Sequence, residues 1–134
     1  MPVCWDAKYE SGDATVDQQH QALFNYVNKL ETQLYAVTID QELVRSVVQY
    51  MSLYAQTHFV YEELCMHRVR CPVAQGNREA HEKFVIVVEK FENRLEQQGV
   101  TPDLVEQLHR VCSDWLTNHI CRVDTKMREY VTAA

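Results

Sequence analysis

The sequence predicts an all-α protein, an up-down-up-down antiparallel four-helix bundle with an N-terminal arm and a short C-terminal helix. Only three Gly and three Pro occur in 134 residues, and most of them lie at the expected ends of long helical segments. Within each segment apolar residues recur at spacings of three and four, as on one face of a helix. Short connections favour antiparallel neighbours, so residues 1–134 are expected to form a single domain.

The first helix is expected at about residues 17–37, after an arm that contains Trp5 and Tyr9 and ends at Gly12. Its apolar stripe consists of Val16, Leu23, Phe24, Val27, Leu30, Leu34 and Val37. The second helix is expected from Asp40, a suitable N-cap because its carboxylate accepts from backbone N–H groups, to about residue 67. Its stripe consists of Leu43, Val47, Tyr50, Met51, Tyr54, Phe59 and Leu64.

The third helix is expected from Asn77 to Gly99, after a loop marked by Pro72 and Gly76. The β-branched run at 84–88 could form a strand in isolation, but its flanks continue the helical stripe on both sides.

The fourth helix is expected to start at Thr101-Pro102, a cap followed by a first-turn proline, and to continue to about His119. A short helical stretch is expected after Asp124.

Composition excludes several classes of function. A net charge of −6 repels phosphate backbones and anionic membranes, which disfavours nucleic acid as a partner. The longest apolar run is far too short to span a bilayer, and no leader is recognisable, so the protein is expected to be soluble and cytoplasmic. Five cysteines without a C-x-x-C pair indicate free thiols, and Cys121 is expected to be an inert buried thiol.

Four histidines are expected at one end of the bundle, one from each helix. His20 begins the first helix and His81 the third, whereas His58 and His119 lie late in the second and fourth, so antiparallel threading brings the four together. The remaining two, His67 and His109, do not fit this level and are expected at the surface.

Two carboxylates share this end. Glu62 follows His58 by four residues and so lies on the same helical face. Asp124 follows His119 by five, which rotates it roughly 140° away on a regular helix, so a break or a widened turn is needed between them. Four imidazoles with two carboxylates suit a pair of iron ions better than one tetrahedral zinc.

A simpler interpretation of each residue stands beside this one. A single histidine on an apolar face is usually a hydrogen-bonded core residue, although four at one end are much less readily explained in that way. Glu62 could be a solvated neighbour of Glu63, and Phe59 and Trp115 could be ordinary core residues.

Four motifs occur in order along nearly the whole chain. They are Asp17-Gln-Gln-His20 with Leu23 and Asn28, His58-Phe-Val-Tyr-Glu62-Glu63 with Met66, His81-Glu-Lys-Phe84, and Trp115-Leu-Thr-Asn-His119-Ile-Cys-Arg-Val-Asp124. This series resembles the motifs of the bacterial hemerythrins, a family of non-haem di-iron proteins that bind oxygen.

The resemblance implies a cofactor and its ligands. It implies two non-haem iron ions, joined by an oxo or hydroxo bridge when oxidised. His20 and His58 would bind one iron, His81 and His119 the other, and Glu62 and Asp124 would bridge them. The resemblance also implies an oxygen pocket lined by Phe59, Trp115, Leu116 and Ile120.

One position departs from the family pattern. The third helix of the family presents two histidines four residues apart, and the partner of His81 would stand at position 77, which is Asn77. A neutral amide is a poor iron donor compared with imidazole. We therefore expect water or hydroxide to complete the shell of this iron and the diferric state to form faster. Alternatively, Asn77 hydrogen-bonds a bound water and the site behaves normally.

Several functions are considered for this sequence, and most of them follow from the resemblance. The leading hypothesis is a binding domain without enzymatic function that senses oxygen or redox state. The expected ligands are dioxygen or small anions, and a signalling output domain fused to this one, such as a diguanylate cyclase, would be a further partner. The alternatives are a reversible oxygen carrier or store, a di-iron peroxidase or ferroxidase, and a metal-free interaction bundle.

Overall fold

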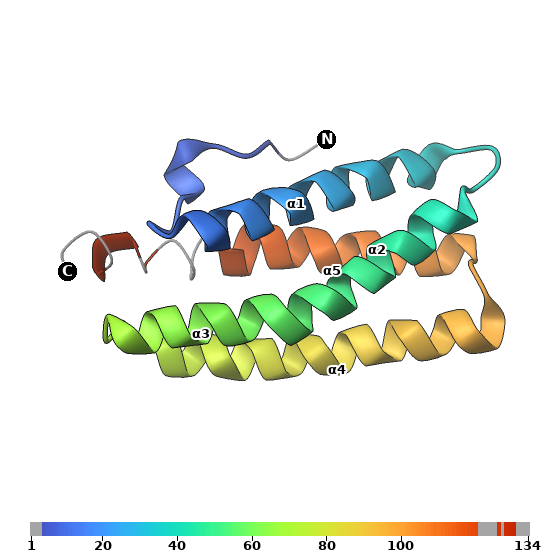
Figure 1. Ribbon diagram of the computed structural model, residues 1–134. Helices are drawn as coiled ribbons and strands as arrows, with labels where there is room; N and C mark the ends of the chain where they lie inside the picture. Colours follow the sequence, from blue (N-terminus) through green and yellow to red (C-terminus); the bar gives the residue numbers. More distant parts are fainter. Residues whose placement is uncertain (1–3, 121–125, 127, 131–134) are drawn as a thin grey trace.

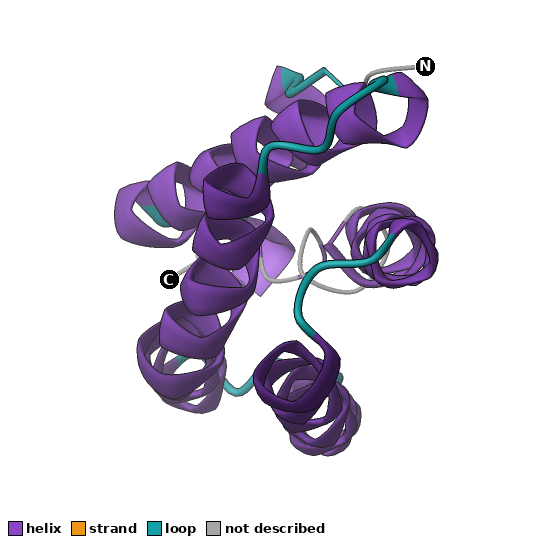
Figure 2. Cartoon of the chain, turned by 90° about the vertical axis from the view of Figure 1, so that its right-hand side faces the viewer, coloured by secondary structure: helices purple, strands orange, loops and turns teal. Residues whose placement is uncertain are grey.

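A computed structural model describes residues 4–120, 126 and 128–130 of the chain, and every element in these ranges is helical (Figures 1 and 2). The α-helices are α1 (Ala14–Glu31), α2 (Gln41–Leu53), α3 (Phe59–Arg68), α4 (Ala74–Gln98) and α5 (Pro102–Asp114). The other elements are the 3₁₀ turns η1 (Ala7–Tyr9) and η2 (Thr32–Tyr35), and the π-helical segments η3 (Tyr54–His58) and η4 (Trp115–Ile120).

These elements form four rods that run alternately along the molecule, which confirms the predicted bundle (Figure 1). The second rod consists of α2, η3 and α3 in direct succession, and the fourth consists of α5 and η4. Helix α1 packs against α2 and α5, while α4 packs against α2, α3 and α5. The first and second halves of the chain therefore share one apolar core.

Capping residues fix where three of the helices begin. Asp13, Asp40 and Thr101 each have extended backbone and accept a hydrogen bond from a backbone N–H in the first turn. These bonds satisfy donors that have no partner within the helix. The N-cap expected at Asp40 and the proline start expected after Thr101 are both confirmed.

Three boundaries and two core positions differ from expectation. Helix α1 begins at Ala14 rather than near residue 17 and ends at Glu31, so Val37 lies beyond it and is fully exposed. Helix α4 begins at Ala74 rather than at Asn77, and Gly76 belongs to its first turn instead of to a loop. Leu64 was expected in the core stripe, but its side chain is 58% exposed on α3. The buried face of α3 at this level is formed instead by the neighbouring residues Cys65 and Met66.

The N-terminal arm is fixed by aromatic contacts with α1. The Trp5 ring meets Phe24 edge-on, with centroids 5.4 Å apart, and the Tyr9 ring lies 5.9 Å from Phe24. Gly12, with a φ of 92°, makes the turn between the arm and the helix. The arm thus covers the outer side of the core without entering the centre of the bundle.

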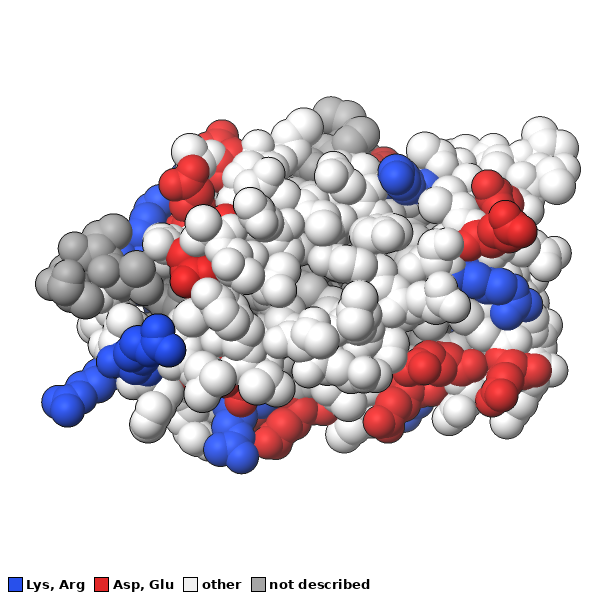
Figure 3. Space-filling model, viewed as in Figure 1, with Lys and Arg blue, Asp and Glu red and all other residues white. Residues whose placement is uncertain are grey.

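The surface carries its charge unevenly. On the face seen in Figure 3, the acidic and basic side chains lie mainly around the margin and the centre is uncharged. Residues 46–61 of the second rod contain no Asp, Glu, Lys or Arg. This face presents no basic patch of the kind that would attract a phosphate backbone. Among the described residues, no helix is both long enough and apolar enough to cross a bilayer.

The thiols agree with the expectation from cysteine spacing. Cys4 is exposed and Cys65, Cys71 and Cys112 are buried, and all four are free. Cys121 lies outside the described residues.

Candidate metal centre

Two π-helical segments lie where the second and fourth rods carry their histidines. His58 is the last residue of η3, and His119 lies within η4. A π turn inserts an extra residue into the helical repeat and so changes the direction of the side chains that follow it. A break or widened turn was expected between His119 and Asp124, and η4 describes this interval only as far as Ile120, so the expectation stays a prediction. Asp124, the residue that this turn was needed for, lies outside the described residues.

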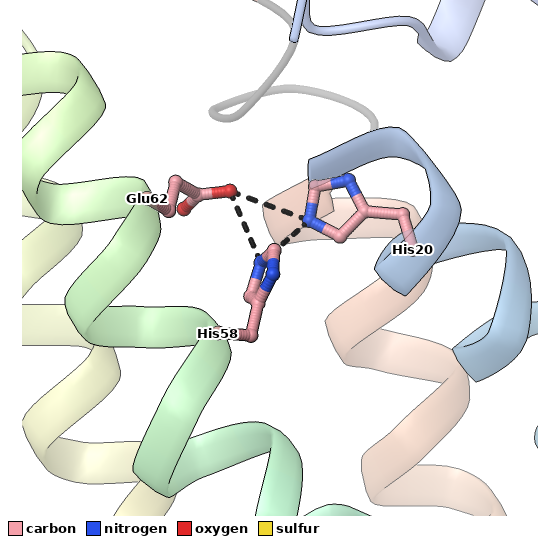
Figure 4. A group of neighbouring side chains, drawn as sticks. All are labelled: His20, His58 and Glu62. Carbon is pink, nitrogen blue, oxygen red and sulfur yellow. Dashed lines mark hydrogen bonds and ion pairs between the residues drawn. The ribbon is translucent and has the colours of Figure 1, made fainter. Parts of the chain in front are cut away.

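One half of the centre is formed by His20, His58 and Glu62, from α1, η3 and α3 (Figure 4). The two Nε2 atoms lie 3.0 Å apart, and each is 3.3 Å from Oε2 of Glu62. All three side chains are buried, with exposed fractions of at most 1%. Two imidazole nitrogens and a carboxylate oxygen converging in a dry space require a proton or a cation between them.

The other half is formed by Glu62, His81 and His119, whose ligand atoms lie within 4.8 Å of one another. His81 Nε2 is 3.3 Å from Oε1 of Glu62. The two oxygens of Glu62 therefore face two different groups of histidines. One buried carboxylate shared in this way has the arrangement of a bridge between two metal ions.

Asn77 lies one turn before His81 on α4 and is also buried. Its Nδ2 donates to Oε1 of Glu62 at 2.7 Å and to the Met66 sulfur at 3.2 Å. Its Oδ1 has no hydrogen-bond partner among the described residues. The amide thus occupies the face on which a ligand was expected, and its oxygen retains an unused acceptor position.

The electrostatics of the centre favour an ionised Glu62. Burial raises the pKa of its carboxyl, but hydrogen bonds from His20, His58 and His81 outweigh burial and hold the pKa well below its usual range. An ionised carboxylate is the form that binds a metal ion. The simpler interpretation of Glu62 as a solvated residue is therefore wrong, because its side chain is 0% exposed.

Aromatic rings pack against three of the histidines. Phe59 stacks on His81 with centroids 3.8 Å apart, Trp115 stacks on His119 at 3.9 Å, and Tyr54 stacks on His58 at 4.4 Å. Four side chains were expected to line an oxygen pocket, and all are buried here: Phe59, Trp115, Leu116 and Ile120. These rings hold the imidazole planes in place and exclude water. Their role toward oxygen remains a prediction.

Sequence reasoning missed the groups behind the histidines. The side-chain oxygen of Gln19 accepts a short hydrogen bond from His58 Nδ1, and Glu63 accepts one from His81 Nδ1 at 3.2 Å. Both residues stand next to an expected ligand in the chain, which was the only available signal. Of the two histidines set aside, His67 is exposed and His109 is partly buried, so neither belongs to the centre.

Comparison with known proteins agrees with this geometry. The model of the hemerythrin HHE cation binding domain matches residues 11–131. The chain belongs to the hemerythrin family. It is 27% identical over 131 residues to a bacteriohemerythrin of Stenotrophomonas maltophilia, covering 98% of this chain and 82% of that protein. It is 26% identical over 129 residues to a hemerythrin of Siphonosoma cumanense, covering 95% of this chain and 92% of that protein.

A third relative is similar over nearly the whole chain. The chain is 26% identical over 127 residues to a hemerythrin-like protein of Naegleria gruberi, covering 95% of this chain and 92% of that protein. A hemerythrin domain binds a non-haem di-iron centre, and members of the family bind dioxygen. The residues present fit such a centre, because a buried, ionised carboxylate lies between two groups of imidazoles and each group could hold a metal ion.

Proposed function

We propose that this hemerythrin domain senses oxygen or redox state rather than carrying oxygen reversibly, and that Asn77 is the residue responsible. The iron pair would be held by His20, His58, Glu62, His81 and His119 together with Asp124. When bound, it supplies one-electron redox chemistry and an affinity for dioxygen. The chain's own residues then decide how well the site is shielded and how many protein nitrogens surround it.

The observation that carries this proposal is the buried amide of Asn77. It lies on the same face of α4 as His81 and donates to Glu62, the carboxylate shared by both groups of histidines. An amide does not replace the nitrogen that an imidazole would donate, so an iron ion held by His81 and His119 would have one protein nitrogen fewer and could take water or hydroxide instead. Hydroxide favours ferric iron, so the oxidised state would form faster than in a site with five histidines.

Aromatic rings cover three of the histidines around the centre. Phe59 and Trp115 cover His81 and His119, and Tyr54 covers His58 while accepting a hydrogen bond from Trp115 Nε1 at 3.3 Å. These rings leave few polar groups through which a proton could enter. The unused acceptor of Asn77 is the polar atom best suited to hold a water molecule at the open position.

Rapid mixing of the diferrous protein with oxygen tests the proposal. We expect the absorption band of the oxygenated protein to decay quickly to the diferric spectrum. Asn77→His should prolong the band by restoring the nitrogen, while Asn77→Gln serves as a control that keeps an amide. A band in the unaltered protein that is as stable as in Asn77→His would contradict a sensing role and support an oxygen carrier.

A further inference from the structure

The two ring nitrogens of His81 face different environments. Nε2 points into the centre, 3.3 Å from Oε1 of Glu62, and Nδ1 points outward, 3.2 Å from Oε2 of Glu63. Because the Glu63 carboxylate accepts from Nδ1, the proton of a neutral His81 ring would lie on Nδ1 and would leave the lone pair of Nε2 available to a metal ion. Glu63 thereby selects the tautomer in which His81 can bind a metal ion.

The corresponding group behind His58 carries no charge. His58 Nδ1 donates to the side-chain oxygen of Gln19, a neutral amide. The two hydrogen bonds are thus of the same kind, but the acceptor is a carboxylate behind His81 and a neutral amide behind His58. A carboxylate behind an imidazole makes the ring a stronger donor than an amide does. The charged group stands in the half that also contains Asn77.

Glu63 lies at the edge of the centre, within reach of water and of Arg78. Its side chain is 27% exposed, and its Oε1 lies 3.9 Å from Nε of Arg78. Arg78 also lies 3.6 Å from Glu82, so it is shared between two carboxylates. Glu63 borders a surface hollow of about 330 Å³ between α3 and α4, where water has access. A carboxylate that water and a cation can reach avoids the large desolvation penalty of full burial.

We propose that Glu63 is a positioning residue that compensates for Asn77. It holds His81 in the tautomer and orientation needed for metal binding, and its charge strengthens the one α4 imidazole that remains. This inference rests on the ligand role proposed for His81. Removing Glu63 should therefore weaken the iron at His81 and His119 selectively, and leave the iron at His20 and His58 in place.

Anaerobic ferrous iron titration against a competing chelator measures the two affinities separately. Glu63→Gln keeps an acceptor for Nδ1 but removes the charge, and we expect affinity for the weaker iron to fall by about tenfold. Glu63→Ala removes both, and the loss should approach about 100-fold. Glu82→Gln is the matched control, since it removes a carboxylate that contacts Arg78 and no histidine, and its affinities should be unchanged.

A second measurement reports on His81 itself. In the zinc-loaded protein, nitrogen NMR distinguishes the two tautomers of each imidazole. In the unaltered protein the proton on Nδ1 of His81 should give a signal protected from exchange with water, and this signal should be lost in Glu63→Ala. Helical circular dichroism establishes that each variant is folded before it is titrated. Gln19→Glu should produce the opposite change, a gain in affinity for the iron at His20 and His58.

The outcomes separate the two proposals. If the unaltered protein holds fewer than two irons, the ligand assignment itself is wrong. If it holds two and Glu63→Ala retains both affinities and the Nδ1 signal, the role of Glu63 alone is overturned. An equal loss of affinity in Glu82→Gln would also overturn it, because a general surface charge would then explain the effect.

Discussion

The Phe59 ring lies parallel to the imidazole of His81, with the planes 2° apart and the centroids separated by 3.8 Å. Phe59 immediately follows His58, so one short segment supplies a candidate ligand to one half of the centre and the support for a ligand in the other. The π-helical turn that ends at His58 places these neighbouring side chains in different halves.

Replacing Phe59 with Ala should therefore affect both stability and the centre. The side chain is 2% exposed, and a cavity of this kind costs about 3–5 kcal/mol in unfolding free energy. Without the stacked ring, His81 loses its fixed plane and water reaches the site, so oxidation of the diferrous protein should accelerate. Urea denaturation and stopped-flow absorption measure the two effects. A loss below about 1 kcal/mol would show that the ring is not a core element.

Glu62 is expected to be required for both irons, because each of its oxygens faces a different group of histidines. Glu62→Ala should abolish iron retention rather than halve it. Iron at a hundredfold excess over the dissociation constant of each site should add about 2.7 kcal/mol per bound iron to the unfolding free energy of the unaltered protein. This increment should disappear in the variant. Anaerobic denaturation with and without ferrous iron is the measurement, and retention of one iron per chain by the variant would contradict a shared carboxylate.

Cys112 should be unreactive in the folded protein. Its burial raises the pKa of the thiol from 9.0 to about 12, so the reactive thiolate is scarce at neutral pH. Native alkylation followed by mass spectrometry should label the exposed Cys4 and leave Cys112 unlabelled. Rapid native labelling of Cys112 would contradict the burial of α5 against the core.

The same thiol should make stability fall in alkali. Because the folded pKa of Cys112 lies above its unfolded value, the stability it contributes is complete below pH 9 and is lost as pH rises toward 12. Over that range Cys112 lowers the unfolding free energy by up to about 1.4 kcal/mol per pH unit. Cys112→Ala should not show this decrease, which is measured by comparing the unfolding free energies of the variant and the unaltered protein as a function of pH. Parallel curves for the two proteins would exclude Cys112 as the source.

The sequence was sufficient to predict the bundle and the meeting of four histidines, because both depend on helix length and alternating direction. Antiparallel threading alone brings His20 and His119 to one end. It was insufficient for Gln19 and Glu63, since a residue next to a ligand points about 100° away on an ideal helix. Only the packing of neighbouring helices decides which imidazole such a side chain reaches.

The position of Gly76 shows a similar limit. Glycine costs about 1 kcal/mol in a helix interior, which favoured a loop at this position. In the first turn of α4 that cost is reduced, because the N–H groups there lack helical partners anyway. Starting the helix at Ala74 places Asn77 firmly within it, with its N–H bonded to Val73 O at 2.9 Å. The orientation of Asn77 toward Glu62 follows from this earlier start.

Asp13 connects the beginning of α1 to α3. Its Oδ1 accepts from Val16 N at 3.0 Å, and its Oδ2 accepts from the Tyr61 hydroxyl at 3.1 Å. Asp40 caps α2 in the same way, through Leu43 N at 3.1 Å, but is exposed. The two residues therefore form a matched pair in which only one also joins two helices.

Asp13→Ala should cost about 2 kcal/mol in unfolding free energy, because it removes the cap and leaves the Tyr61 hydroxyl without this acceptor. Asp40→Ala should cost about 1 kcal/mol, the value of a cap alone. Asp13→Asn should recover most of the loss, since its one amide oxygen can replace Oδ1, which lies 3.0 Å from Val16 N and 3.2 Å from the Tyr61 hydroxyl. Chemical denaturation of the three variants measures the difference. Equal costs for Asp13→Ala and Asp40→Ala would show that the hydrogen bond from Asp13 to α3 adds nothing to the stability.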